Sequence, residues 1–396
     1  MSKSSLIIER IKPVIRFNNK DIVNIHEPYF KKSNAYEYIK ECLDTGWVSS
    51  AGEWVSKFET KIANFTGAKY AIAVSNGTVA LRLALYLVGV RAGDEVIIPP
   101  LSFVATANSI SHLGGFPHFV DIESESLGLC AIALEKRLNE VALKKEGKII
   151  NKLSGKKISA VVPVHVFGMP ANIEEIKKVC SKWNLPLVED AAEALGSKFR
   201  ISNKLIHCGC FGDIGTLSFN GNKIITTGGG GALLTDSNDL AKLAKHLSTT
   251  AKVNHPWNFF HDQIGWNDRL PNINAAVGCS QMEELNSKLE SKRLLHSKFK
   301  QYFKDIKEVE IMSEPSNSES NYWLITLRLK GDQVEELREN IISKAHNTKI
   351  FLRPSWTLLN QLPMYENASS GNLKQAENQS KRLINLPSSP QLMKNL

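Results

Sequence analysis

A regular alternation in the first two thirds of the chain does most to limit the possible fold. Between Gly67 and Asp236, short apolar runs rich in β-branched residues alternate with stretches of helical periodicity. This alternation predicts a parallel sheet whose strands are joined by crossover helices, one of them over 78–87. The strands are expected at 70–74, 95–98, 116–120, 160–164, 185–189, 214–218 and 231–235.

Beyond residue 236 the pattern changes to long helices followed by a smaller mixed region. Helices are predicted over 240–250 and 281–303, and the second is expected to bridge to a small α+β domain containing a strand at 323–329 and a helix at 334–345. We therefore expect an N-terminal segment, 1–50, that joins the small domain, a large domain over 51–285 and a small domain over 286–396.

The composition limits where the protein works and what it binds. No stretch of about 20 apolar residues is present, so we predict a soluble, cytoplasmic protein without a membrane partner. Six cysteines in 396 residues are too few for a disulfide framework. Cys208 and Cys210 lie near His207 but lack a second ligand pair, so no metal is expected. The lysines behind the net charge of +9 are scattered, which favours a phosphate-bearing small substrate over nucleic acid.

The first candidate site element is the turn Ser75-Asn76-Gly77-Thr78, between a predicted strand and a predicted helix. Gly77 lets the backbone approach a ligand closely, and the amides of Gly77 and Thr78 open the helix toward an anion such as phosphate. Asn-Gly is also a common turn, so this element alone does not identify a site.

The second element is the sequence VEDAAEALG, in which an apolar strand ends on Glu189 and Asp190. A buried carboxylate needs a partner, and the protonated nitrogen of a pyridine ring is one that Asp190 could hold. Glu193 could reach the same ring and its phenolic oxygen. The alternative is that Asp190 caps a helix.

The third element is the sequence TLSFNGNKIITTGGGGALLTD, where a strand ends near Ser218 and a polar turn presents Lys223. A lysine beside a packed sheet loses part of its solvation, which makes its amine a usable nucleophile for a Schiff base. The Ser218 hydroxyl is a natural phosphate ligand. A lone lysine in a turn is usually just solvated, but a phosphate turn, a strand-end Asp190 and then Lys223 on one sheet predict a site for pyridoxal 5'-phosphate.

These motifs occur together with others that resemble the DegT/StrS-type sugar aminotransferases from about His26 to Tyr365. The resemblance is closest to the branch that aminates 4-keto-6-deoxy nucleotide sugars for bacillosamine and legionaminic acid synthesis. It rests on TGWVSSAGEWVSKFET, AVSNGTVALRLAL, GDEVIIPPLSFVATANSI, VVPVHVFGMPANIEEI, LVEDAAEALGS, FGDIGTLSFNGNKIITTGGGGALLTD, GWNDRLPNINAAVG and RPSWTLLNQLPMY.

The resemblance implies the aspartate aminotransferase fold, which is fold type I of the pyridoxal-phosphate enzymes, in a homodimer with active sites shared between subunits. It assigns the Schiff base to Lys223 and the pyridine nitrogen to Asp190, and it places Glu193 where the family often has Gln or His. Phe103 would lie against the cofactor face. The phosphate would be held by Gly77, Thr78 and Ser218, joined by Asn267 of the partner subunit.

The resemblance also implies a nucleotide-sugar substrate and glutamate as amino donor. Lys223 would then act as the general base that moves a proton between the donor and the cofactor. The sugar contacts that it suggests are His165, the loop 250–257 with His255 and Trp257, Arg269, Tyr322, Trp323 and Arg353. Trp257 and Trp323 suit a core or an interface equally well.

Two departures and two alternative functions complete the sequence reading. Much of the family has TGEGG where this chain has Thr227 to Gly231, so the acid at position 229 is missing, and the segment before His26 has no usable counterpart. A sugar dehydratase of the same fold typically has histidine in place of the lysine, so Lys223 argues against it. A cofactor-binding regulator would need an added DNA-binding module, for which the N-terminal region leaves little space.

Overall fold

The computed structural model describes residues 2–18, 22–31 and 33–393. Its centre is a seven-stranded sheet in the order β3-β2-β6-β7-β10-β11-β1, in which bridges at Val161 with Leu187 and Val164 with Asp190 connect β6 to β7. The strands are β1 (Tyr70–Val74), β2 (Glu95–Ile98), β3 (Phe116–Phe119), β6 (Lys157–Val161), β7 (Val188–Asp190), β10 (Ile214–Ser218) and β11 (Gly231–Thr235). The sheet is parallel except for β11, which is antiparallel to both of its neighbours.

Helices cover both faces of this sheet because successive strand residues point to opposite sides. In β1, Ile72 and Val74 pack with the cluster around α4, α5 and α8, whereas Ala71 and Ala73 pack with α3 and α9. Two more helices, α6 and α7, bury their apolar faces against β2 and β6. The helices are α3 (Glu53–Thr66), α4 (Gly77–Leu87), α5 (Ala105–Ser111), α6 (Ala131–Val141), α7 (Ile173–Trp183), α8 (Asn238–Ser248) and α9 (Asn272–Glu283).

Three smaller β elements surround the main sheet. The hairpin β4 (Ala142–Lys145) and β5 (Lys148–Asn151) pairs with the start of β6, and β16 (Ser369–Ser370) pairs with β3. A separate three-stranded sheet contains β8 (Lys198–Ile201), β9 (Lys204–His207) and β13 (Ser318–Glu319).

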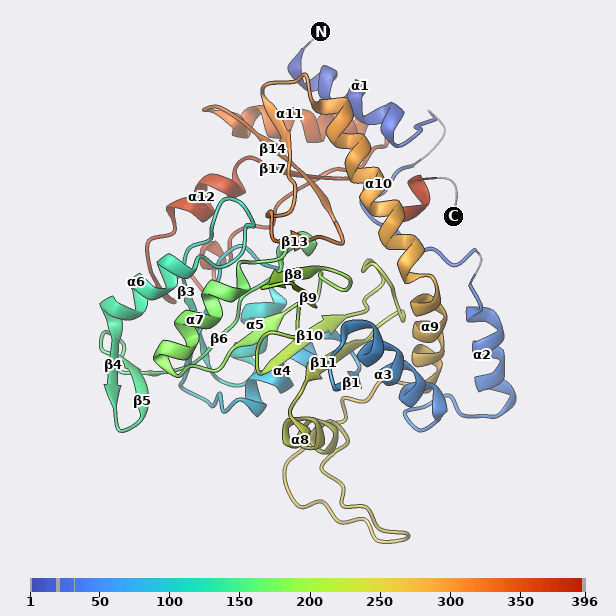
Figure 1. Cartoon of the computed structure of the whole chain (residues 1–396), viewed down its shortest axis with the longest axis vertical. Coiled ribbons are helices and arrows are strands. Elements are labelled where there is room, and N and C mark those ends of the chain that lie inside the picture. The colour runs from blue at the N-terminus through green and yellow to red at the C-terminus, as the bar shows by residue number, and fades with distance from the viewer. Residues whose placement is uncertain (1, 19–21, 32, 394–396) are drawn as a thin grey trace.

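A small lobe lies at the far end of α10 (Leu285–Phe303), which connects it to the large lobe (Figure 1). Its antiparallel sheet has the order β12-β14-β17-β15 and is covered by α1 (Lys3–Val14), α10 and α11 (Val334–Asn347). The strands are β12 (Val309–Ile311), β14 (Ile325–Leu329), β15 (Arg353–Pro354) and β17 (Leu383–Leu386). The short helix α12 (Lys374–Ser380) directly precedes β17 in the chain.

The structure modifies several sequence expectations. The strand expected at 160–164 is β6 at Lys157–Val161, and the strand expected at 185–189 is β7 at Val188–Asp190. The helix expected over 281–303 is divided, since α9 ends at Glu283 and α10 begins at Leu285, with Glu284 at ψ −4°. The N-terminal segment also divides: α1 packs in the small lobe, while α2 (Ala35–Asp44) packs along α9 in the large lobe. Within the described ranges, every helix is too short or too polar to span a bilayer.

Candidate active site

A cavity of about 370 Å³ lies where the two lobes meet, at the C-terminal ends of β7 and β10. Open α/β sheets commonly hold ligands at this edge. The large lobe contributes Asn76, Gly77, Thr78, Phe103, Thr106, Asp190, Glu193, Ser218 and Lys223, and the small lobe contributes Trp323, Arg353, Trp356 and Asn385. The three sequence elements proposed as a cofactor site therefore meet in one space.

The amine of Lys223 lies inside this cavity between an acid and an aromatic ring. Its Nζ atom is 3.3 Å from Glu193 Oε1 and 3.9 Å from the centre of the Trp323 ring. The indole of Trp323 donates a hydrogen bond to the Asn222 carbonyl at 2.7 Å, which fixes the ring beside the turn that carries Lys223. The Lys223 side chain is only 12% exposed, so a ligand in the cavity meets the amine in a largely dehydrated setting.

Glu193 is the anion next to this amine and is held on its other side. Its Oε2 atom accepts the backbone N–H of Phe167 at 2.8 Å. Burial raises the pKa of the Glu193 carboxyl, although the charge of Lys223 and the Phe167 N–H offset part of this effect. The carboxyl therefore binds the Phe167 N–H with one oxygen and faces the Lys223 amine with the other.

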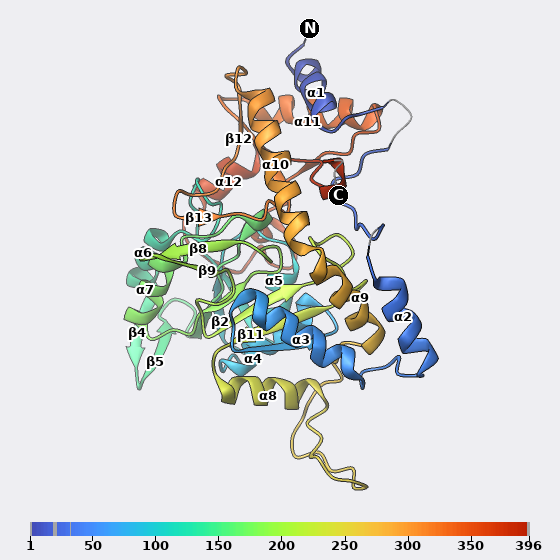
Figure 2. The same ribbon diagram turned by 45° about the vertical axis from the view of Figure 1, so that its right-hand side comes forward.

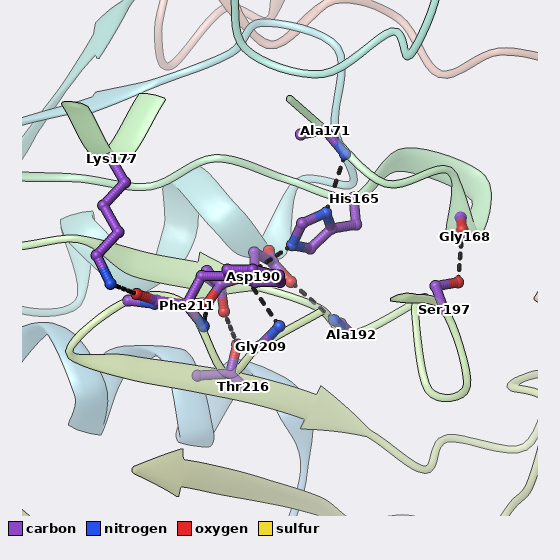
Figure 3. Close-up of polar contacts among 12 residues, drawn as sticks. His165, Gly168, Ala171, Lys177, Asp190, Ala192, Ser197, Gly209, Phe211 and Thr216 are labelled. Carbon is purple, nitrogen blue, oxygen red and sulfur yellow. Dashed lines mark hydrogen bonds and ion pairs between the residues drawn. The ribbon is translucent and has the colours of Figure 1, made fainter. Parts of the chain in front are cut away.

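Asp190 projects into the same cavity from the last position of β7. Its Oδ2 accepts a 2.8 Å hydrogen bond from the Thr106 hydroxyl. Its Oδ1 accepts the Ala192 N–H at 3.2 Å (Figure 3). Asp190 is 7% exposed and is one of the residues that line the cavity. A buried carboxylate fixed in this way suits a cationic ring nitrogen.

The phosphate cradle forms where the start of α4 meets the end of β10. Asn76 caps the helix by accepting the Val79 N–H at 2.9 Å, which leaves the amides of Gly77 and Thr78 free to face the cavity. A Cβ atom on Gly77 would lie 2.8 Å from Ser218 Cβ, so only glycine permits this approach. Together with Asp190 and Lys223, this cradle fits the phosphate, the ring nitrogen and the carbonyl group of pyridoxal phosphate.

Two further aromatic residues, Phe103 and Trp356, line the cavity. Phe103 is 52% exposed and lies 6.1 Å from the ring of Trp356, which in turn packs on Phe167 at 4.9 Å. Phe103 was expected against the cofactor face, and its position on the lining agrees with a ring contact of that kind.

Two expected sugar contacts, His165 and Tyr322, lie elsewhere. His165 is fully buried, with Nε2 3.0 Å from Glu189 Oε2 and Nδ1 accepting the Ala171 N–H at 3.1 Å, so neither nitrogen is free for a sugar. Tyr322 has φ 46°, which turns its ring into the small lobe, where it stacks on His296 at 3.8 Å. Neither side chain is among the residues that line the cavity, and their role as sugar contacts stays a prediction.

The other expected substrate residues divide between the cavity and the outer surface. Trp323 and Arg353 line the cavity. Asn267 and Arg269 are exposed and bonded to each other, with Arg269 Nη2 3.0 Å from Asn267 Oδ1. His255 and Trp257 lie on a loop after α8 that projects from the body, where Trp257 is 80% exposed (Figure 2). The role of these four residues in a shared site stays a prediction.

The structure also reveals cavity residues that the sequence reading did not single out. They include Thr106, which bonds Asp190, together with Trp356, Asn385 and Ile25. Thr106 lies three positions after Phe103 at the start of α5 and donates its N–H to the Phe103 carbonyl at 3.2 Å, so the placement of Phe103 was an available signal for it. Trp356 and Asn385 come from the small lobe, and no local pattern marks them.

Comparisons with known proteins agree with this geometry. Residues 30–395 match the sequence model of the DegT/DnrJ/EryC1/StrS aminotransferase family. A GDP-perosamine synthase of Escherichia coli O157:H7 is 35% identical over 357 residues, which are 90% of this chain and 90% of that protein. The putative pyridoxal phosphate-dependent aminotransferase EpsN of Bacillus subtilis is 36% identical over 84% of this chain and 81% of its own length.

Solved structures show the same architecture. The aminotransferase TlmJ from Streptoalloteichus hindustanus superposes with a TM-score of 0.82 at 25% identity, covering 93% of this chain and 94% of that one. Helicobacter pylori PseC, an aminotransferase involved in pseudoaminic acid biosynthesis, gives a TM-score of 0.81 at 25% identity, with 93% and 94% covered. With a matching sequence model over most of its length and Lys223 and Asp190 in one cavity, the chain belongs to the DegT/DnrJ/EryC1/StrS aminotransferase family and is a pyridoxal-phosphate-dependent aminotransferase.

Proposed function

We propose that this enzyme transfers the amino group of glutamate to C4 of a nucleotide-linked 4-keto-6-deoxy hexose. The observation that carries the proposal is the joint presence of Lys223, Asp190 and the Gly77 cradle in a cavity that opens between the lobes beside Arg353. The planar guanidinium of Arg353 suits a carboxylate or a diphosphate, because it can donate two parallel hydrogen bonds.

The relatives support a nucleotide-linked sugar and leave two candidates. Three are named GDP-perosamine synthase, and one that is 30% identical over 63% of this chain is named UDP-2-acetamido-2-deoxy-3-oxo-D-glucuronate aminotransferase. The motif resemblance favours a sugar with an acetamido group at C2, for surface glycans of the bacillosamine or legionaminic acid type. A GDP-linked sugar and a UDP-linked acetamido sugar are therefore the two substrates to compare.

The chain's own residues have separate tasks in this reaction. Bound pyridoxal phosphate supplies an electron sink that lets the donor's α-carbon lose a proton. Asp190 keeps a proton on the ring nitrogen, and Lys223 Nζ takes the proton from the donor's α-carbon and later returns one to the sugar's C4. The aromatic wall of Phe103, Trp323 and Trp356 keeps water from this space.

We further propose a homodimer in which Asn267 and Arg269 complete the partner's site. Both side chains are exposed at the base of the projecting loop. That loop carries the exposed apolar side chains Trp257, Phe259, Phe260 and Ile264. An apolar group of this size on a protein surface is typical of an interface.

The test uses purified enzyme loaded with pyridoxal phosphate, glutamate, and each of the two keto sugars in turn, with the product followed by mass spectrometry. Wild type should yield an amino sugar, and Lys223→Ala should not. Lys223→Arg is the matched control, because it keeps the cation but cannot bond to the cofactor.

Three other outcomes would redirect the assignment. If glutamate bleaches the cofactor's visible absorption but neither sugar is aminated, the substrate assignment is wrong. Loss of water from the sugar without amination would identify a dehydratase. Absorption that no amino donor changes would favour a cofactor-binding regulator.

A further inference from the structure

His165 and Glu189 form a buried pair, and neither is among the residues that line the cavity, although their chain neighbours Val164 and Asp190 are. Figure 3 shows His165 with its hydrogen bond from Ala171. Because His165 Nδ1 accepts the Ala171 N–H, the ring proton must sit on Nε2, which donates to Glu189 Oε2 at 3.0 Å. These two bonds fix the orientation of the ring and hold together both ends of the turn from His165 to Ala171.

Glu189 is a fixed anchor for this ring. Its oxygens also accept the backbone N–H groups of Gly209 at 2.9 Å, Phe211 at 2.6 Å and Gly212 at 2.7 Å. Burial alone would raise the pKa of Glu189, but the hydrogen bonds from His165 and these amides lower it overall. With four donors on one carboxylate, Glu189 has little freedom to move.

The turn that His165 starts reaches the reactive amine in two steps. Phe167, two residues on, has the left-handed φ of 58° and donates its N–H to Glu193 Oε2 at 2.8 Å. The other oxygen of Glu193 is 3.3 Å from Lys223 Nζ. The position of Phe167 therefore sets the position of the acid beside the amine.

The same turn also holds the aromatic neighbour of the amine. The Phe167 carbonyl accepts the Leu324 N–H at 3.2 Å, and the Gly168 carbonyl accepts the hydroxyl of Ser320 at 2.9 Å. Both donors flank Trp323, whose ring lies over Lys223. The turn thus holds the two groups that surround the amine, one from each lobe.

We propose that His165 and Glu189 are a positioning pair that sets the amine of Lys223 indirectly, through Phe167 to Glu193 and through Leu324 to Trp323. The proposal rests on Lys223 as the cofactor lysine but not on which sugar is aminated. It gives His165 a role in the chemistry of the lysine and none in contact with substrate.

Three variants of His165 separate the bonds of this pair. His165→Phe removes both nitrogens. His165→Gln can still reach Glu189, and His165→Asn can still accept from Ala171 but is too short for Glu189. The matched control is His118→Phe, because His118 is equally buried and bonds Glu95 at 2.7 Å in a network away from the cavity.

Two readouts need no sugar. The first is the rate at which the visible absorption band forms when each apoenzyme is mixed with pyridoxal phosphate, and the second is the rate and glutamate KM of its bleaching by glutamate. Small displacements of a reacting group slow chemistry strongly, so His165→Phe and His165→Asn should slow both steps about tenfold or more. The glutamate KM should stay within about twofold, and His165→Gln should recover most of the rate.

The expected control result is a lower Tm for His118→Phe with both rates unchanged. If His165→Phe does not fold, His165→Asn and His165→Gln still test the bond to Glu189. Equal slowing in His118→Phe would overturn the proposal, as would wild-type rates in His165→Asn or a rise in glutamate KM with a normal rate of cofactor attachment. Failure of wild type itself to bind the cofactor would refute the proposed function, which is a different result.

Discussion

Gly77 lies so close to Ser218 that a Cβ atom on the glycine would come 2.8 Å from Ser218 Cβ and 3.1 Å from its hydroxyl oxygen. Gly77→Ala must therefore push apart the two elements that form the phosphate cradle. Overpacking of this kind costs about 1–3 kcal/mol, so we expect cofactor affinity to fall about tenfold or more. Titration of the apoenzyme with pyridoxal phosphate, followed by fluorescence, measures this change.

Gly229→Ala is the control for this substitution, because position 229 lies beside the same turn but has room. The nearest atom to a new Cβ there is the Ser75 carbonyl oxygen at 3.8 Å, which is ordinary contact. Its affinity for the cofactor should match wild type. Equal losses in the two variants would show that the approach of Gly77 to Ser218 is not what matters.

We expect the carboxylate of Asp190 to be essential for kcat, and the Thr106 hydroxyl that bonds it to contribute less. Removal of one partner from a buried charge pair costs about 3–5 kcal/mol, so Asp190→Asn should lower kcat by more than about a hundredfold. Thr106→Val deletes the 2.8 Å bond to Asp190 Oδ2 and the 2.7 Å bond between the Thr106 and Ser102 hydroxyls, but it keeps the carboxylate, so it should cost about tenfold. Steady-state kinetics on both variants tests this order, and a larger loss for Thr106→Val would contradict it.

Glu95 makes the stability of the enzyme depend on pH in acid. Burial alone would raise the pKa of its carboxyl, but hydrogen bonds from His118, Asn151 and Ser154 outweigh burial and lower the pKa from 4.5 to about 2. A carboxyl whose pKa is lower in the folded state than in the unfolded state stabilises the fold at pH values above the unfolded-state pKa. This stabilisation is lost as the pH falls from about 4.5 to about 2. Glu95→Gln should remove roughly 3 kcal/mol of this pH-dependent stability, as seen in urea unfolding across that range.

A surface variant checks that this effect belongs to the buried network. Glu135 pairs with Lys182 at the surface and its side chain is 39% exposed. Glu135→Gln should follow the wild-type pH curve closely, because exposed ion pairs contribute little. A wild-type curve for Glu95→Gln would mean that the network does not depress the pKa of Glu95.

The shared-site proposal predicts complementation between two inactive variants. Lys223→Ala removes the reactive amine, and Asn267→Asp places a negative charge where the partner's cofactor phosphate is proposed to bind. If sites are shared, a hybrid dimer has one site with both changes and one intact site, so a refolded mixture should regain activity. A mixture as inactive as its parents would place Asn267 in the site of its own subunit's Lys223, and an active Asn267→Asp parent would place Asn267 in neither site.

The strands and the cofactor residues could be predicted because each depends on local sequence. The apolar runs gave strands at 70–74, 95–98, 214–218 and 231–235 at the expected bounds. The direction of β11 was not predictable, since nothing in its five residues distinguishes an antiparallel strand. Lys223, Asp190 and Gly77 were found because they follow strands whose ends meet at one edge.

The positions of His165 and Tyr322 could not be predicted, for a different reason. His165 and Tyr322 sit beside residues with positive φ or in turns, where one backbone angle decides whether a side chain faces the cavity or the core. Sequence periodicity carries no information on such angles. Trp356 and Asn385 depend on how the two lobes dock, which no local pattern describes.

The packing of α1 has a consequence for the order in which the protein can fold during synthesis. Its buried residues Ile7, Ile11 and Val14 share one core with Leu295 and Ile341, which lie in α10 and α11. During synthesis α1 therefore has no partner for its apolar face until α10 and α11 have emerged. The large lobe can complete its seven-stranded sheet by residue 235, whereas the small lobe can close only after residues 285–347 have joined α1.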